Sequence, residues 1–212
     1  MLMRSSYYDK RRSKIKQLVL QTLDDLMTMK DYYLTYLKKP SAENKERILQ
    51  METYVDKNEK KVDKTIQEVM SVQQLDKNEI KWLFTMSRMI RELERIGDQM
   101  TNIITISKLS DVKELQQMIQ QFFHYEEDMM SKLKAGIDED NSEALEAVID
   151  LDQQVNTLNK NTYREVVTLI NRAAPMTESK LKMVVISRFL ERIGDHLVNV
   201  ARIYLKVISL RK

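Results

Sequence analysis

The chain has 212 residues, which is long enough for one sizeable domain or two small ones whose core needs no disulfide or structural metal. The absence of cysteine excludes disulfides and thiolate metal ligands, and His124 and His196 are the only imidazoles. The 35 basic and 32 acidic residues are interspersed and leave a net charge of +3, so the charge pattern does not favour nucleic-acid binding.

The N-terminal segment is basic but lacks the apolar stretch of a secretory signal. No window reaches the roughly eighteen uninterrupted apolar residues that a membrane helix needs. We therefore expect a cytoplasmic protein that reaches a membrane only through a membrane-bound partner.

The composition favours long helices, since the chain contains only three glycines and two prolines but many Leu, Met, Lys, Glu and Gln residues. In chain order, we predict helices over residues 4–38, 42–73, 77–107, 112–137, 142–172 and 178–210. Asp76 and Glu79 have the spacing of a capping box, and Asp111, Ser142 and Thr177 are candidate N-caps. Short connections make successive helices antiparallel, so the expected fold class is all-α with no sheet.

The same six residues, Leu-Glu-Arg-Ile-Gly-Asp, occur at 93–98 in the third helix and at 190–195 in the sixth, a separation of 97. A weaker alignment at an offset of 93 relates the second helix to the fifth. It pairs Val55 with Val148, Glu59 with Asp152, and Asp63 with Asn156. The chain therefore reads as a duplicated three-helix unit, with repeats at 1–108 and 109–212 that form two tandem three-helix bundles.

Each copy of the motif places a glutamate, an aspartate and an asparagine on one helical stripe at positions i, i+4 and i+8. These residues are Glu94, Asp98 and Asn102 in the first copy and Glu191, Asp195 and Asn199 in the second. Carboxylates at i and i+4 repel by a few tenths of a kcal/mol, and a glycine inside a helix costs roughly 1 kcal/mol relative to alanine. A bound cation would turn this repulsion into shared coordination by hard oxygen ligands.

A helical wheel places these carboxylates far from the centre of the apolar stripe, so we expect them to point outward. The motif glycines, Gly97 and Gly194, fall on the flank of the stripe, where a missing side chain lets another helix come close. On the second helix, Glu59 and Asp63 repeat the acid pair, and an antiparallel bundle would gather four carboxylates on a surface shelf.

The plainer alternative is that these acids are solvated or paired with neighbouring arginines. The duplication and the glycines inside the helices favour the metal hypothesis. The predicted ligands are Glu59, Asp63, Glu94, Asp98, Asp152, Glu191 and Asp195, with Asn102, Asn156 and Asn199 as supporting ligands. Because Asn156 replaces an acid, we expect the second site to bind metal less tightly. His196 is equally compatible with a supporting ligand and with an ordinary helix residue.

The duplicated motif on the third helix of a repeated three-helix unit resembles the hallmark of the PhoU family of phosphate-transport accessory proteins. The resemblance implies six helices in two similar bundles, metal ions on the acidic motifs, and a homodimer. Iron is the first choice of metal, with manganese, magnesium and zinc as alternatives. The implied role is regulatory and not enzymatic: the protein would restrain a phosphate ABC transporter through its ATPase subunit and repress signalling by a phosphate-sensing histidine kinase.

Two alternatives stay open. A PhoU-like protein could instead be the regulatory partner of a sodium/phosphate cotransporter. The other alternative is a carboxylate-bridged metalloenzyme of the ferritin-like kind, whose core ligands include Glu-x-x-His. The sequence contains no Glu-x-x-His and no nucleophile paired with a base, so we expect no catalytic residue.

Overall fold

The structure is a computed structural model that describes residues 2–72, 74–107, 112–171 and 177–209. Within these ranges the chain forms six helices and no strand: α1 (Leu2–Lys38), α2 (Ala42–Val72), α3 (Lys77–Ile106), α4 (Val112–Asp138), α5 (Ser142–Asn171) and α6 (Glu178–Ser209). The all-α prediction is confirmed, and every helix end lies within two residues of its expected position. None of the described helices combines the length and apolar character needed to cross a bilayer.

The start of α3 is held by the predicted capping box. The Asp76 side chain accepts hydrogen bonds from the backbone N–H groups of Asn78 and Glu79, while Glu79 Oε2 accepts from the Asp76 N–H at 2.8 Å. These contacts satisfy amides that the first helical turn otherwise leaves without partners.

Two other predicted caps can be compared with the structure. Thr177 Oγ1 accepts from the backbone N–H of Lys180 at the start of α6, as expected. At the start of α5 the cap is Asn141, whose side chain accepts from Ala144 N at 3.1 Å. The prediction of Ser142 was therefore wrong by one residue. Asp111 lies outside the described residues.

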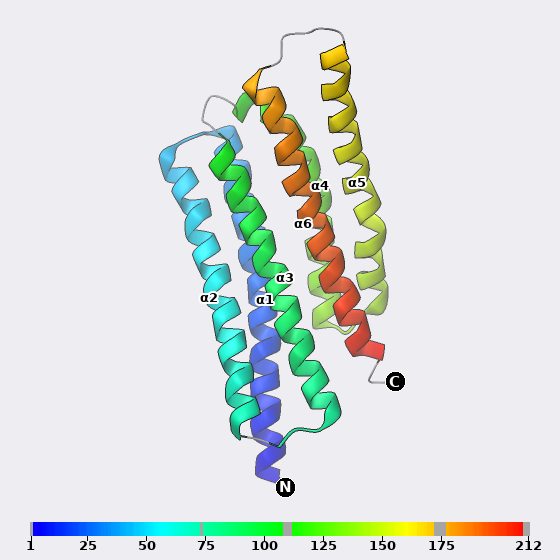
Figure 1. Cartoon of the computed structure of the whole chain (residues 1–212). Helices are drawn as coiled ribbons and strands as arrows, with labels where there is room; N and C mark the ends of the chain where they lie inside the picture. The colour runs from blue at the N-terminus through cyan, green and yellow to red at the C-terminus, as the bar shows by residue number, and fades with distance from the viewer. Residues whose placement is uncertain (1, 73, 108–111, 172–176, 210–212) are drawn as a thin grey trace.

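The six helices form two three-helix bundles that lie side by side (Figure 1). Helices α1, α2 and α3 pack together, as do α4, α5 and α6, and the bundles meet where α3 packs on α6 and α1 packs on α4. The predicted repeat boundary, between residues 108 and 109, lies outside the described residues.

Charged side chains strengthen the contact between α1 and α4. The side chain of Lys30 is only 2% exposed, and its Nζ lies 2.9 Å from Glu127 on α4. Lys134 Nζ lies 2.6 Å from Asp24 Oδ1 on α1. The two bundles are thus joined by ion pairs as well as by apolar packing.

The contacts of the motif glycines show how the helices of the two repeats correspond. A Cβ atom at Gly97 would lie 3.4 Å from Val55 Cγ1, and one at Gly194 would lie 3.1 Å from Val155 Cγ1. The structure therefore pairs Val55 with Val155, an offset of 100, and the predicted offset of 93 was wrong by one heptad. A shift of seven residues rotates a helix face by only about 20°, so both registers keep the same apolar stripe.

The same offset of 100 relates α1 to α4. It pairs these buried side chains: Ile15 with Leu115, Val19 with Ile119, Leu23 with Phe123, Met29 with Met129, and Leu37 with Ile137.

The same alignment places Glu126 of α4 where the first repeat has the buried Leu26. Glu126 is 0% exposed, and neither of its carboxylate oxygens has a hydrogen-bond partner among the described residues. Burial holds the pKa of Glu126 well above its usual range.

Candidate metal centre

The two copies of the motif occupy equivalent seams, one between α2 and α3 and the other between α5 and α6. The leucines and isoleucines of the motif, Leu93 and Ile96 in the first copy and Leu190 and Ile193 in the second, are fully buried. Gly97 and Gly194 both face valines of the neighbouring helix. A Cβ atom at Gly194 would lie only 3.1 Å from Val155 Cγ1, whereas one at Gly97 would make an ordinary contact at 3.4 Å, so the predicted close packing is confirmed at Gly194. The apolar part of the motif thus fixes where its acids lie.

Five carboxylates gather at the first seam. Burial, then the charges of Asp98, Asp56 and Glu59, raise the pKa of Glu94 to about 7. Burial and the charge of Asp56 raise the pKa of Asp98, and burial with Asp56 and Asp98 raises the pKa of Glu52. These electrostatic influences indicate that the five carboxylates lie near one another, partly buried, along both helices.

Glu52 and Asp56 were absent from the predicted ligand set. They form a Glu-x-x-x-Asp pair on α2, one heptad before Glu59 and Asp63, and they are the counterparts of Asp152 and Asn156 at the observed offset of 100. The sequence shows the spacing of this pair, but it does not show which of the two consecutive heptads of α2 faces the acids of α3.

The two predicted acids of α2 lie close to each other but have different partners on α3. Glu59 belongs to the cluster and contributes to the raised pKa of Glu94. Asp63 instead accepts from Ser87 Oγ at 3.0 Å and from Arg91 Nη2 at 3.3 Å. Asn102 is exposed on α3, one turn beyond Asp98.

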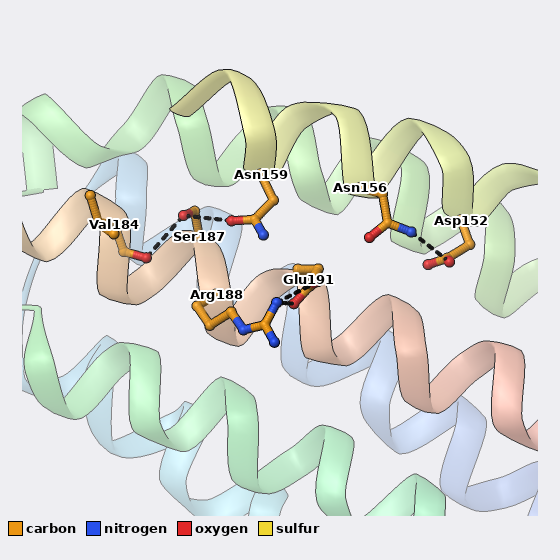
Figure 2. A network of polar contacts seen from close by, with 7 residues as sticks. All are labelled: Asp152, Asn156, Asn159, Val184, Ser187, Arg188 and Glu191. Atoms are coloured by element: carbon orange, nitrogen blue, oxygen red, sulfur yellow. Dashed lines mark hydrogen bonds and ion pairs between the residues drawn. The ribbon is translucent and has the colours of Figure 1, made fainter. Parts of the chain in front are cut away.

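The second seam carries a smaller set of acids (Figure 2). Asn156 Nδ2 donates to Asp152 Oδ2 at 2.8 Å, while Asp152 Oδ1 is buried and has no hydrogen-bond partner in the described ranges. Burial, then the charge of Asp195, raises the pKa of Asp152. A Cβ atom at Gly194 would lie 3.0 Å from Asp152 Oδ1, so this oxygen fills the space that the glycine leaves.

Glu191 corrects the expectation that the motif acids point outward. It is only 8% exposed, and Arg188 Nη1 donates to its Oε1 at 2.6 Å (Figure 2). Burial and the charge of Asp195 nevertheless raise the pKa of Glu191. Asp195 itself is exposed as predicted. The helical wheel did not predict this burial because it describes α6 alone, whereas in the structure α5 covers the flank of α6 that carries Glu191.

Asn199 and His196 lie at the contact between the bundles. Asn199 Nδ2 donates to Glu92 Oε2 at 2.9 Å, and His196 Nδ1 lies 2.9 Å from the same oxygen. Although burial opposes the change, hydrogen bonds from His196 and Asn199 lower the pKa of Glu92. Glu92 was missed because its partners come from the other repeat, more than a hundred residues away in sequence.

The donor set of the first seam fits a hard cation. It consists of carboxylates whose mutual repulsion a cation would relieve, and oxygen ligands of this kind suit magnesium, manganese and iron. Among the described residues, no three acid or histidine side chains are already grouped as metal ligands, so binding would require carboxylates to turn toward a shared ion. The second seam offers Asp152 Oδ1, which has no hydrogen-bond partner among the described residues, but it has fewer acids, and Arg188 pairs with Glu191 there.

Three comparisons relate the chain to known proteins. The PhoU domain family model matches residues 13–107 and 119–204. A Clostridium acetobutylicum protein described as a "phosphate-specific transport system accessory protein PhoU homolog" is 22% identical over 177 residues, which cover 82% of this chain and 81% of that protein.

Two solved structures share the fold. PhoU from Pseudomonas aeruginosa superposes with a TM-score of 0.74 at 16% identity, covering 98% of each chain. The phosphate transport system regulatory protein PhoU from Streptococcus pneumoniae gives a TM-score of 0.78 at 16% identity, covering 94% of this chain and 96% of that one.

Proposed function

Because this chain belongs to the PhoU family, we propose that it is an accessory regulator of a phosphate transport system. The observation that carries the proposal is the match of the PhoU domain to both repeats, which together span most of the chain. The Clostridium relative, named as an accessory protein of phosphate-specific transport, adds support over a similar share of its length. The family resemblance identified from the sequence motif is confirmed.

In this proposal the protein restrains a high-affinity phosphate ABC transporter through its ATPase subunit when phosphate is plentiful. It also keeps a phosphate-sensing histidine kinase in its repressing state, and it does so as a cytoplasmic homodimer. The arrangement of the acids supports a regulatory role, since they lie along seams between helices and not in a bundle core as ferritin-like ligands do. Light scattering on the purified protein tests the dimer.

In this proposal, metal ions would hold the two helices of a seam in a fixed position relative to each other. Glu52, Asp56, Glu94 and Asp98, with Glu59 beside them, would hold the first ion or ions and supply most of the negative charge. A cation shared by α2 and α3 would fix the two helices against each other and give a partner a rigid surface. Iron, manganese, magnesium and zinc are the candidates.

The experiment replaces the chromosomal gene by a deletion or by the Glu94→Ala/Asp98→Ala variant. In high-phosphate medium, we expect both strains to show higher phosphate uptake and higher expression of a phosphate-starvation reporter. A matched control is Glu146→Ala/Asp150→Ala, which removes an exposed acid pair of the same spacing from α5 and should leave both readouts unchanged.

The regulatory role and the metal site can be refuted independently. Unchanged uptake and reporter expression in the deletion strain would contradict the regulatory role. Elemental analysis of purified protein, with and without reconstitution by iron or manganese, tests the metal: equal metal content in the native chain and in Glu94→Ala/Asp98→Ala would show that the first seam is not the site. Capture of a sodium/phosphate cotransporter in place of an ABC transporter would reassign the partner.

A further inference from the structure

A groove with a basic lining opens between α5 and α6, beyond the acids of the second seam. It has a volume of about 420 Å³ and is lined by Asn159, Lys160, Tyr163, Arg164, Val184 and Arg188. Three of these side chains are cationic and none is acidic. Its volume lies within the range of pockets that bury small organic ligands.

The cations of the groove are available to a ligand. Lys160 and Arg164 are exposed, and neither forms an ion pair within the described part of the chain. Arg188 contacts Glu191 through Nη1, which leaves Nη2 and Nε without a contact among the described residues. The Ser187 hydroxyl has one proton and two acceptors at 3.0 Å, Asn159 Oδ1 and the Val184 carbonyl oxygen (Figure 2). The Asn159 amide nitrogen has no contact among the described residues.

A comparison of the two repeats shows that the positive charge at this place is greater in the second. The corresponding positions are Glu59 for Asn159, Lys60 for Lys160, Asp63 for Tyr163, Lys64 for Arg164, and Arg91 for Arg188. In the first repeat Asp63 pairs with Arg91 at 3.3 Å. The second repeat keeps every cation but has exchanged both acids for a neutral amide and a phenol.

We propose that this groove binds a phosphate-bearing anion. Guanidinium groups pair with phosphate oxygens through two parallel hydrogen bonds, and a lysine adds a point charge. Tyr163 is 60% exposed and offers a ring face on which a planar base can stack. A nucleoside phosphate matches the volume, the charge and the ring together, and inorganic phosphate is the other source of the same chemistry. The inference concerns a second site and does not rest on the proposed regulatory function.

Calorimetric titration of the full chain with ATP, ADP and inorganic phosphate, in a magnesium-free buffer of fixed ionic strength, tests the proposal. We expect Lys160→Ala/Arg164→Ala to weaken anion binding by about tenfold or more, since losing about 1.4 kcal/mol of charge pairing is a tenfold change. The matched control, Lys60→Ala/Lys64→Ala, removes the same charges from the first repeat and should leave binding unchanged. Circular dichroism confirms that the variants, all of exposed side chains, keep their helices.

The Tyr163→Ala variant distinguishes a nucleoside phosphate from inorganic phosphate as the ligand. If it weakens ATP binding but not phosphate binding, the ligand is a nucleotide that stacks on the ring. If phosphate and ATP bind alike and Tyr163→Ala changes neither, the groove recognises the phosphoryl group alone, which also supports the proposal. The absence of binding by all three anions at millimolar concentration, or equal weakening by the first-repeat control, would overturn it.

Discussion

Replacement of the buried carboxyl group of α4 should make the protein more stable. Glu126 has no exposed surface and, within the part of the chain that the structure describes, no hydrogen-bond partner; the first repeat carries Leu26 at the same place. An unpartnered buried polar group costs about 1–3 kcal/mol, and a buried leucine contributes about 1.5–3 kcal/mol. We therefore expect Glu126→Leu to raise the free energy of unfolding by at least about 2 kcal/mol at about pH 4.

The gain should grow as the pH rises. The pKa of Glu126 is raised in the folded state, so above the unfolded-state pKa the folded chain holds a proton that the unfolded chain releases. The free energy of unfolding of the native chain then falls by about 1.4 kcal/mol per pH unit until the folded-state pKa is reached. Other acids with raised pKa values give the same trend in both proteins, so the difference between variant and native chain isolates Glu126.

The measurement is urea unfolding followed by far-UV circular dichroism at several pH values between about 4 and 8. Glu126→Gln is the control, because an amide keeps the unpartnered polar group but cannot ionise. Glu126→Gln should lose the part of the pH dependence that Glu126 contributes, while retaining most of the low-pH cost of a buried polar group. A destabilised Glu126→Leu protein, or a difference from the native chain that does not change with pH, would refute the reasoning.

Two further predictions concern the motif. Gly97→Ala should be the more stable of the two glycine replacements by about 1 kcal/mol in thermal unfolding, since its Cβ meets nothing closer than 3.4 Å whereas that of Gly194→Ala meets Asp152 Oδ1 at 3.0 Å. In metal-free protein, carbon-detected NMR should show Glu94 titrating at about 7, and Asp98→Asn should lower that pKa by removing a neighbouring charge. Metal affinity should rise with pH through this range, because the ligand must lose its proton.

Each of these two predictions has a clear contrary result. Equal stability of the alanine variants at both glycines would mean that the second seam relaxes without cost. A Glu94 carboxyl group that titrates at its ordinary value, near that of an exposed glutamate, would show that the acids of the first seam do not influence one another.

The helices were predictable because their signals are local. Asp76 and Glu79 lie three residues apart and satisfy the first amides of the same helix, so their effect needs no other part of the chain. Of the two motif glycines, Gly194 was assigned correctly as a point of close approach, because a Cβ atom there would lie 3.1 Å from Val155 Cγ1 on α5.

The composition of the proposed metal site could be assigned only from the tertiary structure. Glu52 and Asp56, not Asp63, lie beside Glu94 and Asp98, because the register of α2 against α3 is set by which valine meets Gly97. The sequence could not choose between two heptads that bury nearly the same face.

By itself, then, the sequence determined six helices, their ends, the duplicated motif and the family that it indicates. Only the tertiary structure decided which acids meet across a seam and that Glu191 is buried against Arg188. It also decided that the buried Glu126 has no hydrogen-bond partner among the described residues. The physical reason is that helix formation depends on neighbours within a turn or two. Charge, burial and pKa depend on side chains that packing brings together from distant parts of the chain.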